Sequence, residues 1–510
     1  QPKARDRQAL YRYDIPTGIY EPVLYGYRST ALLDISPDGK ELLLGLYTKD
    51  WQHTPFDETT LLRYTLATGK VDTIFSREIE IAQAYFIPGT EDILVTGSPN
   101  SFKGVGNVLP DGRTGNGYQH ELFRVNSTTG KVTPLTRDFD PTVEQVQYHA
   151  KSKSFYLLTD NGSRQSLFRL DVKTNKIHTI NAKEDVVRGF SVASAGNTFY
   201  YFGQSLNNAD RLYSLDPSGK SKLVWDISAE KLRGVKFTPA KDFIYRTPDG
   251  VDIDGWYYLP PNFDPTKKYP MIVYYYGGTT PLTRSLETVY NLPMFAAQGY
   301  VAFSLNPRGT TGYGQAFAAD HLNAWGTKTA DDIIGAVKDF VAKHPFVDGK
   351  KIGCTGASYG GFMTQYLQTK TDLFAAAVSH AGISSISSYW AGGFWGLGYS
   401  SVASAGSYPW NNPELYTKHS PLFNADKIHT PLLLLHGDSD TNVPTSESVN
   451  LYNALKVLGR EVELIEFTGQ DHFILEPERR EKWTASIQAW FARFLKDDAS
   501  WWHQLYDEKK

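Results

Sequence analysis

The run Gly356-Ala357-Ser358-Tyr359-Gly360 constrains the fold of this chain more than any other stretch. It follows a short apolar run of strand type (351–355) and precedes a helix-forming run (362–369). A serine with glycines two residues to either side, in this place, is typical of a sharp strand-to-helix turn that lifts the hydroxyl above a parallel sheet. The glycines are required because a Cβ there would collide with the neighbouring backbone. A glycine-rich turn whose serine only caps the helix is the alternative interpretation.

The length and charge of the chain limit its class. At 510 residues the chain is too long for one hydrophobic core, so we expect two or more domains. The net charge of −3 indicates no nucleic-acid partner. No run approaches the ~18 apolar residues of a membrane span, and residues 1–6 contain no apolar signal core, so no membrane partner is expected. The single cysteine, Cys354, excludes an internal disulfide. The compartment stays open, with a periplasmic or secreted location slightly favoured over the cytoplasm.

The first half of the chain repeats a unit of short strands and polar turns. Copies recur about every 45–60 residues, and they lie at 9–18, 61–70, 121–131, 166–176 and 211–220. This period predicts an all-β propeller over residues 1–240, with an irregular β-sandwich as the alternative. Only four to five blades are recognisable. Because a propeller closes on itself to hide strand edges, we expect either a small propeller or an incomplete one whose first blades precede Gln1. The glycine-rich segment 97–119 is expected to be a long exposed loop.

In the second half, residues 241–510, apolar strands alternate with helices. This pattern predicts a doubly wound, mostly parallel sheet with ligands bound at the carboxyl ends of the strands, as in an α/β hydrolase. The expected strands are 254–259, 271–276, 300–305, 351–355, 375–379, 431–436 and 461–467. One helix is expected to open at Thr329 with Asp332 completing a capping box. Two more are expected over 446–458 and 478–495.

A serine in such a turn becomes a nucleophile only when a base takes its proton and an acid orients the base. In this fold the acid and then the histidine follow the serine along the chain. Asp438 and Asp440 both follow the expected strand 431–436, and His472 follows the strand 461–467. The sequence therefore predicts Ser358 as nucleophile and His472 as base, with two candidates for the acid.

Other titratable residues near these strand ends fit the roles less well. His436 lies too close to the acid loop to be the base and is expected to be structural. His380 precedes the acid, which is the wrong order, and Asp471 is expected to point away from its neighbour His472. An oxyanion also needs donors. The N–H of Tyr359 opens the helix, and Tyr276 stands in the loop where this fold places a second donor, although a packed aromatic is equally compatible with that spacing.

The second half resembles the catalytic domain of the prolyl oligopeptidase family of serine peptidases, which includes dipeptidyl peptidase IV and acylaminoacyl peptidases. The resemblance covers about residues 240–496. It rests on the motifs Tyr276-Gly277-Gly278, Asn306-Pro307-Arg308-Gly309-Thr310-Thr311-Gly312-Tyr313-Gly314, Gly356-Ala357-Ser358-Tyr359-Gly360-Gly361, His436-Gly437-x-x-Asp440-x-x-Val443-Pro444 and Asp471-His472.

The resemblance implies a β-propeller set over an α/β-hydrolase domain. It selects Asp440 rather than Asp438 as the acid of the triad. It also implies that Tyr276 and the Tyr359 amide form the oxyanion site, and that Tyr359, Tyr389 and Val443 line the primary specificity pocket.

We therefore expect a serine peptidase that hydrolyses short peptides through an acyl-enzyme on Ser358. An aromatic-lined pocket suits proline or a small apolar residue before the cleaved bond. Peptide substrate is the expected partner; no metal or cofactor is expected, and a homodimer is one option for the oligomeric state. An acyl-peptide hydrolase or esterase with the same triad is the alternative, and a binding module with an inert hydrolase half is the alternative from another class. Dipeptidyl peptidases of the family hold the substrate amine with adjacent glutamates, and this sequence has no such pair.

Overall fold

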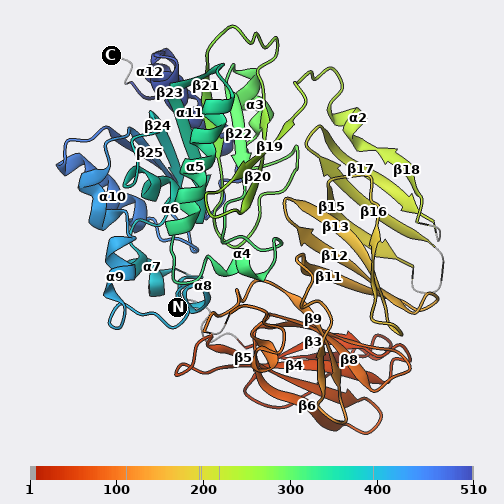
Figure 1. The fold of residues 1–510 in the computed structure, drawn as a ribbon. Coiled ribbons are helices and arrows are strands. Elements are labelled where there is room, and N and C mark those ends of the chain that lie inside the picture. The colour runs from red at the N-terminus through yellow and green to blue at the C-terminus, as the bar shows by residue number, and fades with distance from the viewer. Residues whose placement is uncertain are drawn as a thin grey trace.

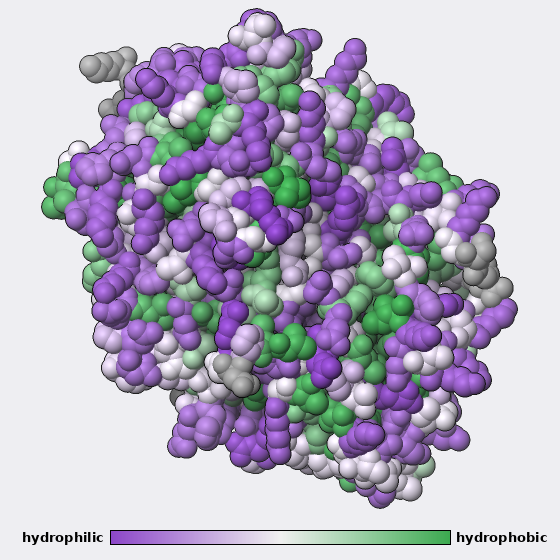
Figure 2. Space-filling view, viewed as in Figure 1, coloured by the Kyte–Doolittle hydropathy of each residue, from purple (hydrophilic) through white to green (hydrophobic). Residues whose placement is uncertain are grey.

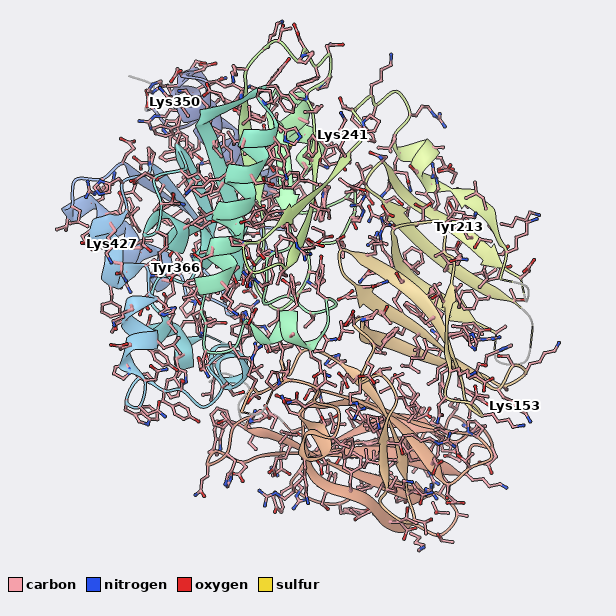
Figure 3. All side chains as sticks on the ribbon, in the orientation of Figure 1. Lys153, Tyr213, Lys241, Lys350, Tyr366 and Lys427 are labelled. Atoms are coloured by element: carbon pink, nitrogen blue, oxygen red, sulfur yellow. The ribbon has the colours of Figure 1, made fainter. Side chains whose placement is uncertain are left out.

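The computed structural model of the chain describes residues 7–507 apart from 111, 194, 195, 197, 217, 218 and 394. Residues 1–6, whose sequence lacks an apolar signal core, lie outside the described residues. The chain forms a β-rich part, red to yellow in Figure 1, and a part with helices around a mixed sheet, green to blue. Figure 3 marks Tyr213 in the β-rich part and Lys241 where the mixed sheet begins.

Antiparallel units of four strands build the β-rich part, preceded by a two-stranded pair. The pair is β1 (Tyr11–Tyr13) and β2 (Tyr20–Pro22). The first two units are β3 (Ser29–Ile35), β4 (Glu41–Lys49), β5 (Asp57–Thr65) and β6 (Lys70–Ile79), then β7 (Ile81–Phe86), β8 (Asp92–Gly97), β9 (Glu121–Asn126) and β10 (Val132–Pro134). The last two are β11 (Thr142–His149), β12 (Ser154–Asn161), β13 (Arg164–Asp171) and β14 (Ile177–Ile180), then β15 (Val186–Val192), β16 (Phe199–Ser205), β17 (Asn208–Leu215) and β18 (Ser221–Asp226). One parallel residue pair between β13 and β15 joins these two units into an eight-stranded sheet.

These units stack face to face, as propeller blades do. In β4, Leu43 packs with residues of the next unit, such as Ile93, while Leu42 and Leu44 pack toward the β1–β2 pair. A strand buried on both faces needs consecutive apolar residues instead of alternating ones. Four copies of the sequence repeat cover the third strand of a unit and the turn toward the fourth: residues 61–70, for example, run from β5 to the start of β6. The copy at 9–18 covers β1 and the turn after it. The stacking of small four-stranded sheets is unlike a sandwich, in which two sheets face each other.

The segment 97–119 differs from the exposed loop that its glycines predict. It contains a short helical turn, α1 (Ser101–Gly104), and the side chains of Asn116 and Gln119 are fully buried. Oε1 of Gln119 accepts a hydrogen bond from the N–H of Gly312 in the second part of the chain, at 3.2 Å. The prediction of an exposed loop is therefore wrong for the two ends of the segment, which are buried, whereas Val108, Pro110 and residues 112–114 are exposed as predicted. The buried residues Asn116 and Gln119 lie in the junction between the two parts of the molecule.

The second part is built on one eight-stranded sheet with the order β19-β20-β22-β21-β23-β24-β25-β26. The strands from β22 to β26 pair in parallel, while β19 and β20 pair antiparallel at one edge. Their bounds are β19 (Lys241–Arg246), β20 (Asp252–Tyr258), β21 (Tyr269–Tyr274), β22 (Val301–Leu305), β23 (Val347–Ala357), β24 (Ala376–His380), β25 (Leu432–Gly437) and β26 (Val462–Phe467).

Seven of these strands match the expected ones to within a few residues. The sequence analysis misses β19, whose charged ends weaken the strand pattern. The domain division at 240/241 stays a prediction; β19 is the first strand of the mixed sheet and begins at Lys241.

Helices cover both faces of this sheet (Figure 1). On one face the core contains Val273, Leu432 and Leu434; on the other it contains Ile272 and Leu433, because successive strand residues point to opposite faces. The helices of the chain beyond α1 are α2 (Ile227–Lys231), α3 (Leu292–Ala297), α4 (Gln315–Ala319), α5 (Thr327–Lys343), α6 (Tyr359–Gln368), α7 (Ile386–Gly392), α8 (Gly396–Ala403), α9 (Pro413–Lys418), the 3₁₀ helix η1 (Leu422–Lys427), α10 (Ser446–Val457), α11 (Pro477–Leu495) and α12 (Ser500–Tyr506).

Helix α5 does not begin with the expected capping box. Its N-cap is Gly326, three residues before Thr329, so Thr329 lies inside the helix. The Asp332 carboxylate instead pairs with the buried guanidinium of Arg308 at 2.7 Å, and the Thr329 hydroxyl donates to the Arg308 carbonyl at 2.9 Å. The capping-box prediction is therefore wrong, because a buried arginine competes for the carboxylate more strongly than a backbone N–H does.

The surface in the view of Figure 2 is mostly hydrophilic, with hydrophobic patches scattered over both parts. Among the residues that the structure describes, no helix combines the length and the apolar character needed to span a membrane.

Buried hydrogen bonds join the two parts. The Asn116 amide donates to the Ala318 carbonyl at 3.0 Å, and the Gln315 amide donates to Oε1 of Glu121 at 2.5 Å. Glu121 is 1% exposed. Burial raises the pKa of this carboxyl group to about 8, despite the hydrogen bond from Gln315. The junction therefore contains a carboxyl group that is protonated near neutral pH.

We predict that Glu121→Gln reduces the pH dependence of stability. The folded-state pKa lies above the ordinary value of 4.5, so the stabilisation is complete below that value and is lost as pH rises toward 8. Glutamine keeps the shape but does not ionise. From pH 5 to 8 the Tm of the wild type should fall further than that of the variant, by on the order of a few degrees. Thermal unfolding followed by circular dichroism measures this, and equal pH dependence in both proteins would contradict it.

Candidate active site

Ser358 stands at the turn between β23 and α6 in a backbone conformation that side chains rarely adopt, with φ 59° and ψ −119°. The turn is possible because Gly356 and Gly360 lack side chains. A Cβ on Gly356 would lie 2.6 Å from the Gly360 carbonyl oxygen, and one on Gly360 would lie 2.9 Å from the Tyr275 carbonyl oxygen. The Ser358 N–H donates to the His380 carbonyl at 2.9 Å. Backbone strain of this kind costs about 1–3 kcal/mol and is concentrated at functional sites.

The structure brings Asp440 and His472 together. Nδ1 of His472 lies 2.8 Å from Oδ2 of Asp440, and both side chains are almost fully buried. Oδ1 of Asp440 accepts the backbone N–H groups of Asn442 at 2.8 Å and Val443 at 2.9 Å. The carboxylate is thereby fixed, and it in turn holds one ring nitrogen of His472, so the other is available to the cavity.

His436 supports the same carboxylate from the other side. Its Nε2 lies 3.2 Å from Oδ2 of Asp440 and 2.9 Å from the Val443 carbonyl oxygen, and its Nδ1 lies 2.7 Å from the Ser448 hydroxyl. Burial acts to raise the pKa of Asp440, but the hydrogen bonds from His436 and His472 outweigh it and hold this pKa well below its ordinary value. Asp440 therefore stays ionised, as a residue that stabilises an imidazolium must.

The rival acids lie elsewhere. Asp438 accepts the N–H of Gly469 at 2.6 Å, and Asp471 accepts the N–H groups of Thr441 and His472 at 2.8 Å each. Both are exposed. They hold the two loops in place, and Asp440 is the acid that contacts the imidazole.

Ser358 and His472 line one cavity of about 530 Å³. No hydrogen bond joins the Ser358 hydroxyl directly to the His472 imidazole in this structure; both belong to the described residues. Hydrogen bonds of a catalytic pair are often long without substrate and tighten when it binds. The two side chains therefore line the same cavity without a direct hydrogen bond between them.

Tyr276 lies next to the nucleophile. Burial raises the pKa of its hydroxyl, and an interaction with the Ser358 side chain acts in the opposite direction. A raised pKa keeps the phenol protonated across the working range, so it remains a hydrogen-bond donor. The ring lies 6.3 Å from that of Tyr359, whose backbone N–H is at the first position of α6. A side-chain donor and a helix N-terminal donor thus flank the serine, as an oxyanion site requires.

Aromatic rings form the wall of this cavity. Tyr359, Tyr389 and Val443, the three pocket residues implied by the family resemblance, all line it. The sequence analysis missed Tyr118, Trp395 and Tyr399, which also line it. Tyr118 comes from the segment 97–119 of the β-rich part and lies 6.1 Å from Tyr399, ring to ring. Nothing in the local pattern of Tyr118 indicated this position, since it depends on how the two parts meet.

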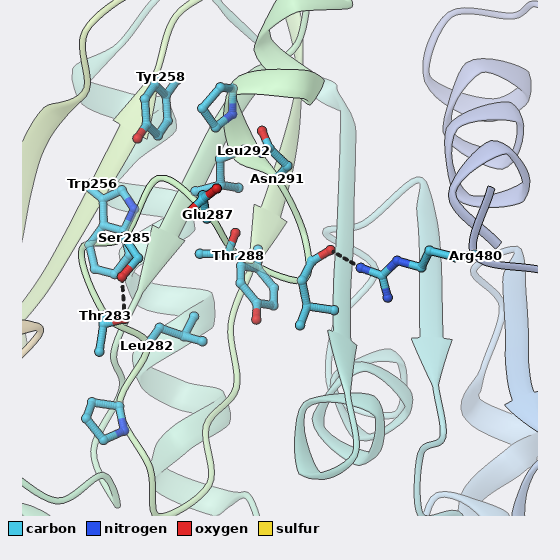
Figure 4. Close-up of a pocket in the computed structure, with 14 residues that line it drawn as sticks. Trp256, Tyr258, Leu282, Thr283, Ser285, Glu287, Thr288, Asn291, Leu292 and Arg480 are labelled. Atoms are coloured by element: carbon cyan, nitrogen blue, oxygen red, sulfur yellow. Dashed lines mark hydrogen bonds between the residues drawn. The ribbon is translucent and has the colours of Figure 1, made fainter. Parts of the chain in front are cut away.

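A second cavity of about 620 Å³ adjoins the first and is shown in Figure 4. The two share Tyr274, Pro281, Leu282 and Val289 in their walls. Nη2 of Arg480 donates to the Val289 carbonyl at 3.1 Å, which ties the dividing loop to α11. This cavity contains neither Ser358 nor His472, so we place the chemistry in the first one.

No group of three or more His, Cys, Asp or Glu residues within the described ranges is arranged to hold a metal ion. The arrangement around Ser358 brings together a serine hydroxyl, an imidazole paired with a carboxylate, a phenol and a helix N-terminal N–H. These parts suit acyl transfer to a serine hydroxyl.

Residues 286–498 match the family model described as the prolyl oligopeptidase family. The chain belongs to the prolyl oligopeptidase family. This confirms the resemblance drawn from the sequence motifs. The chain is 29% identical over 401 residues to dipeptidyl-peptidase 5 of Porphyromonas gingivalis, covering 74% of this chain and 56% of that protein. It is 30% identical over 350 residues to the uncharacterised peptidase YuxL of Bacillus subtilis, covering 68% and 52%. The chain thus spans about half the length of the curated relatives it matches.

Solved structures of prolyl oligopeptidase relatives share the fold. The acylaminoacyl peptidase of Pyrococcus horikoshii superposes with a TM-score of 0.72 at 22% identity, covering 96% of this chain and 85% of that one. Dipeptidyl peptidase 4 of Porphyromonas gingivalis superposes with a TM-score of 0.70 at 15% identity, covering 97% and 80%. The fold is a β-propeller-like domain followed by an α/β hydrolase, as the sequence predicts.

We predict that an alkyl fluorophosphonate labels Ser358. Labelling should fall in a one-proton step as pH is lowered, because a protonated imidazole cannot accept the hydroxyl proton. Asp440 stays ionised through that step, since its pKa is held low. His472→Ala should lower the labelling rate by about 10² to 10⁴. Mass spectrometry of the intact protein measures this.

His419→Ala is the matched control, because this histidine is half-buried and lies outside the cavity. Labelling that is independent of pH, or equal in the two histidine variants, would contradict a histidine base.

Proposed function

We propose that the chain is a serine peptidase that hydrolyses short peptides through an acyl-enzyme on Ser358. The observation that carries the proposal is the convergence in one cavity of Ser358, the Asp440–His472 pair and the Tyr276 hydroxyl. These side chains come from the ends of β21, β23, β25 and β26, where ligands bind in a parallel sheet.

The proposed reaction has two steps. His472 takes the Ser358 proton as Oγ attacks the peptide carbonyl, and the Tyr276 hydroxyl and the Tyr359 N–H stabilise the oxyanion. His472 then gives the proton to the leaving amine. In the second step His472 takes a proton from a water molecule as that water attacks the ester. His472 then gives this proton to Oγ of Ser358 as the acid product leaves. Asp440 stabilises the imidazolium in both steps.

The walls of the cavity support a compact apolar residue before the cleaved bond. Tyr359 and Tyr389 are buried and Val443 closes the cavity beside them. Rigid rings around a narrow space favour proline or a small aliphatic side chain over a long or charged one. Tyr118 reaches this cavity from the β-rich part. A site roofed in this way admits short peptides and excludes folded proteins.

Relatives named dipeptidyl-peptidase 5 support release of dipeptides from a free N-terminus. Structural neighbours named acylaminoacyl peptidase support the second candidate, an acyl-peptide hydrolase that uses the same triad. An esterase is a further use of this machinery, since the same groups cleave esters. The β-rich part, which contributes Tyr118 to the cavity, would decide among them by whether it binds a free amine or a blocked N-terminus of the substrate.

We predict cleavage after proline or small apolar residues in a mixed peptide library. Cleavage sites are found by mass spectrometry in two libraries, one with free and one with acetylated N-termini. Cuts two residues from free N-termini support the dipeptidyl activity, and removal of acetylated residues supports the alternative. Ser358→Ala should lower kcat by about 10⁶. Equal cleavage by this variant would mean that the nucleophile is misassigned.

We predict that Tyr276→Phe lowers kcat by roughly 10² to 10³ without a matching rise in KM, because the lost hydrogen bond forms only with the oxyanion. Steady-state kinetics on a dipeptide anilide measure both constants. Tyr452→Phe is the control, since this partly buried tyrosine lies outside the cavity. An unchanged kcat in Tyr276→Phe would remove this hydroxyl from the oxyanion site.

A further inference from the structure

His380 is a buried histidine that has no role in the proposed triad. It ends β24 and is 1% exposed. Neither ring nitrogen, Nδ1 nor Nε2, has a hydrogen-bond partner within the described part of the protein. Buried polar atoms are nearly always hydrogen-bonded, and leaving them unpaired is unfavourable. The ring therefore has the capacity to bind a group that is not part of the chain.

The ring stands beside the nucleophile. His380 lines the same cavity as Ser358 and His472. In the sheet it pairs with Ala357, the residue before Ser358, and its carbonyl accepts the Ser358 N–H at 2.9 Å. The backbone that carries Ser358 thus lies one strand spacing from that of His380, and both residues line the cavity in which the acyl group would form.

A second unpartnered polar atom lies in this region. Tyr290 also lines the cavity, and its hydroxyl has no partner at hydrogen-bonding distance within the described residues, although the Thr355 hydroxyl lies near enough to influence its pKa. The rings of Tyr290 and His380 each lie 5.3 Å from the ring of Trp483, which holds both in place. Small polar molecules are held in buried sites by two to four such atoms. The His380 ring and the Tyr290 hydroxyl can each donate and accept a hydrogen bond, which suits a water molecule.

We propose that His380 binds the water molecule that attacks the acyl-enzyme, and that it therefore acts in deacylation and not in acylation. This inference rests on the proposed function. The water gives one O–H to His472 and the other to the acceptor nitrogen of His380. As its oxygen bonds to the acyl carbon, His472 takes the first proton. The bond between the acyl carbon and Oγ of Ser358 then breaks, Oγ receives the proton from His472, and the carboxylic acid leaves.

His380 is suited to hold this water without competing for its proton. Burial, followed by the charges of His472 and His436, lowers the pKa of His380 to about 3. The charge of Arg480 acts in the same direction and that of Asp440 in the opposite one. The ring is therefore neutral over the working range of a histidine base, with one N–H and one lone pair. It can orient a water molecule while His472 remains the base.

The test separates the two steps in His380→Phe, which keeps a flat ring against Trp483 but removes both nitrogens. Stopped-flow kinetics with the p-nitrophenyl ester of a good substrate give acylation from the burst and deacylation from the steady state. We expect deacylation to slow about tenfold, the effect of one lost hydrogen bond, and acylation to change by less than about twofold. With hydroxylamine added, the acyl group should shift about tenfold from acid to hydroxamate product, because that nucleophile does not depend on the water site.

Three comparisons decide the outcome. His380→Asn, which retains a donor and an acceptor, should recover part of the deacylation rate. His344→Phe, a histidine packed on Phe340 outside the cavity, should change neither step. Equal slowing of both steps, or an unchanged partition between water and hydroxylamine, would overturn the proposal.

Failure of the proposed function and misfolding of the variant can each be told apart from failure of the His380 proposal. A wild type that forms no acyl-enzyme at Ser358 would contradict the proposed function itself. Thermal unfolding checks that His380→Phe is folded, and His380→Leu replaces it in the same comparison should it not be.

Discussion

The close approach of the backbone around Ser358 is the constraint on which the rest of the site depends. The residue is held at positive φ between two glycines whose Cβ positions are occupied by carbonyl oxygens of neighbouring elements. Its N–H is tied to the end of β24 through the His380 carbonyl. Such strain persists only where the surrounding structure fixes it. The parallel sheet, buried on both faces, supplies that rigidity.

A buried negative charge is the second organising feature. Asp440 is buried, and an isolated carboxylate would be strongly disfavoured there. Two histidines and two backbone N–H groups surround it and keep it ionised. The site thus fixes its charge before any substrate arrives, which is the preorganisation that electrostatic catalysis needs. His436 does more than fill space in the core, because its Nε2 contacts the Asp440 carboxylate that pairs with His472 and helps to keep it ionised.

The cavity belongs to both parts of the chain. Ser358, Tyr276 and His472, which follow strands of the mixed sheet, line one side of the cavity, and Tyr118 of the β-rich part also lines it. The junction that positions Tyr118 is polar, with amide side chains and one protonated carboxyl group in buried hydrogen bonds. Domain contacts of this polar kind resemble transient protein interfaces more than a hydrophobic core. The stability of the junction and the shape of the cavity beside Ser358 are therefore linked.

The sequence by itself determined the elements whose signal is local. Glycines around Ser358, apolar runs of strand length and the repeat in the first half predicted the elbow, seven strands of the mixed sheet and the stacked four-stranded units. The order of Ser358, Asp440 and His472 along the chain followed from fold topology, and family resemblance chose between two acids.

Only the tertiary structure decided the features that depend on distant partners. Asp332 pairs with Arg308 instead of capping a helix, Asn116 and Gln119 of the segment 97–119 are buried, and His380 lines the cavity with unpaired ring nitrogens. The physical reason is that local propensity follows from neighbours in sequence, whereas burial and hydrogen-bond partners are set by which surfaces meet.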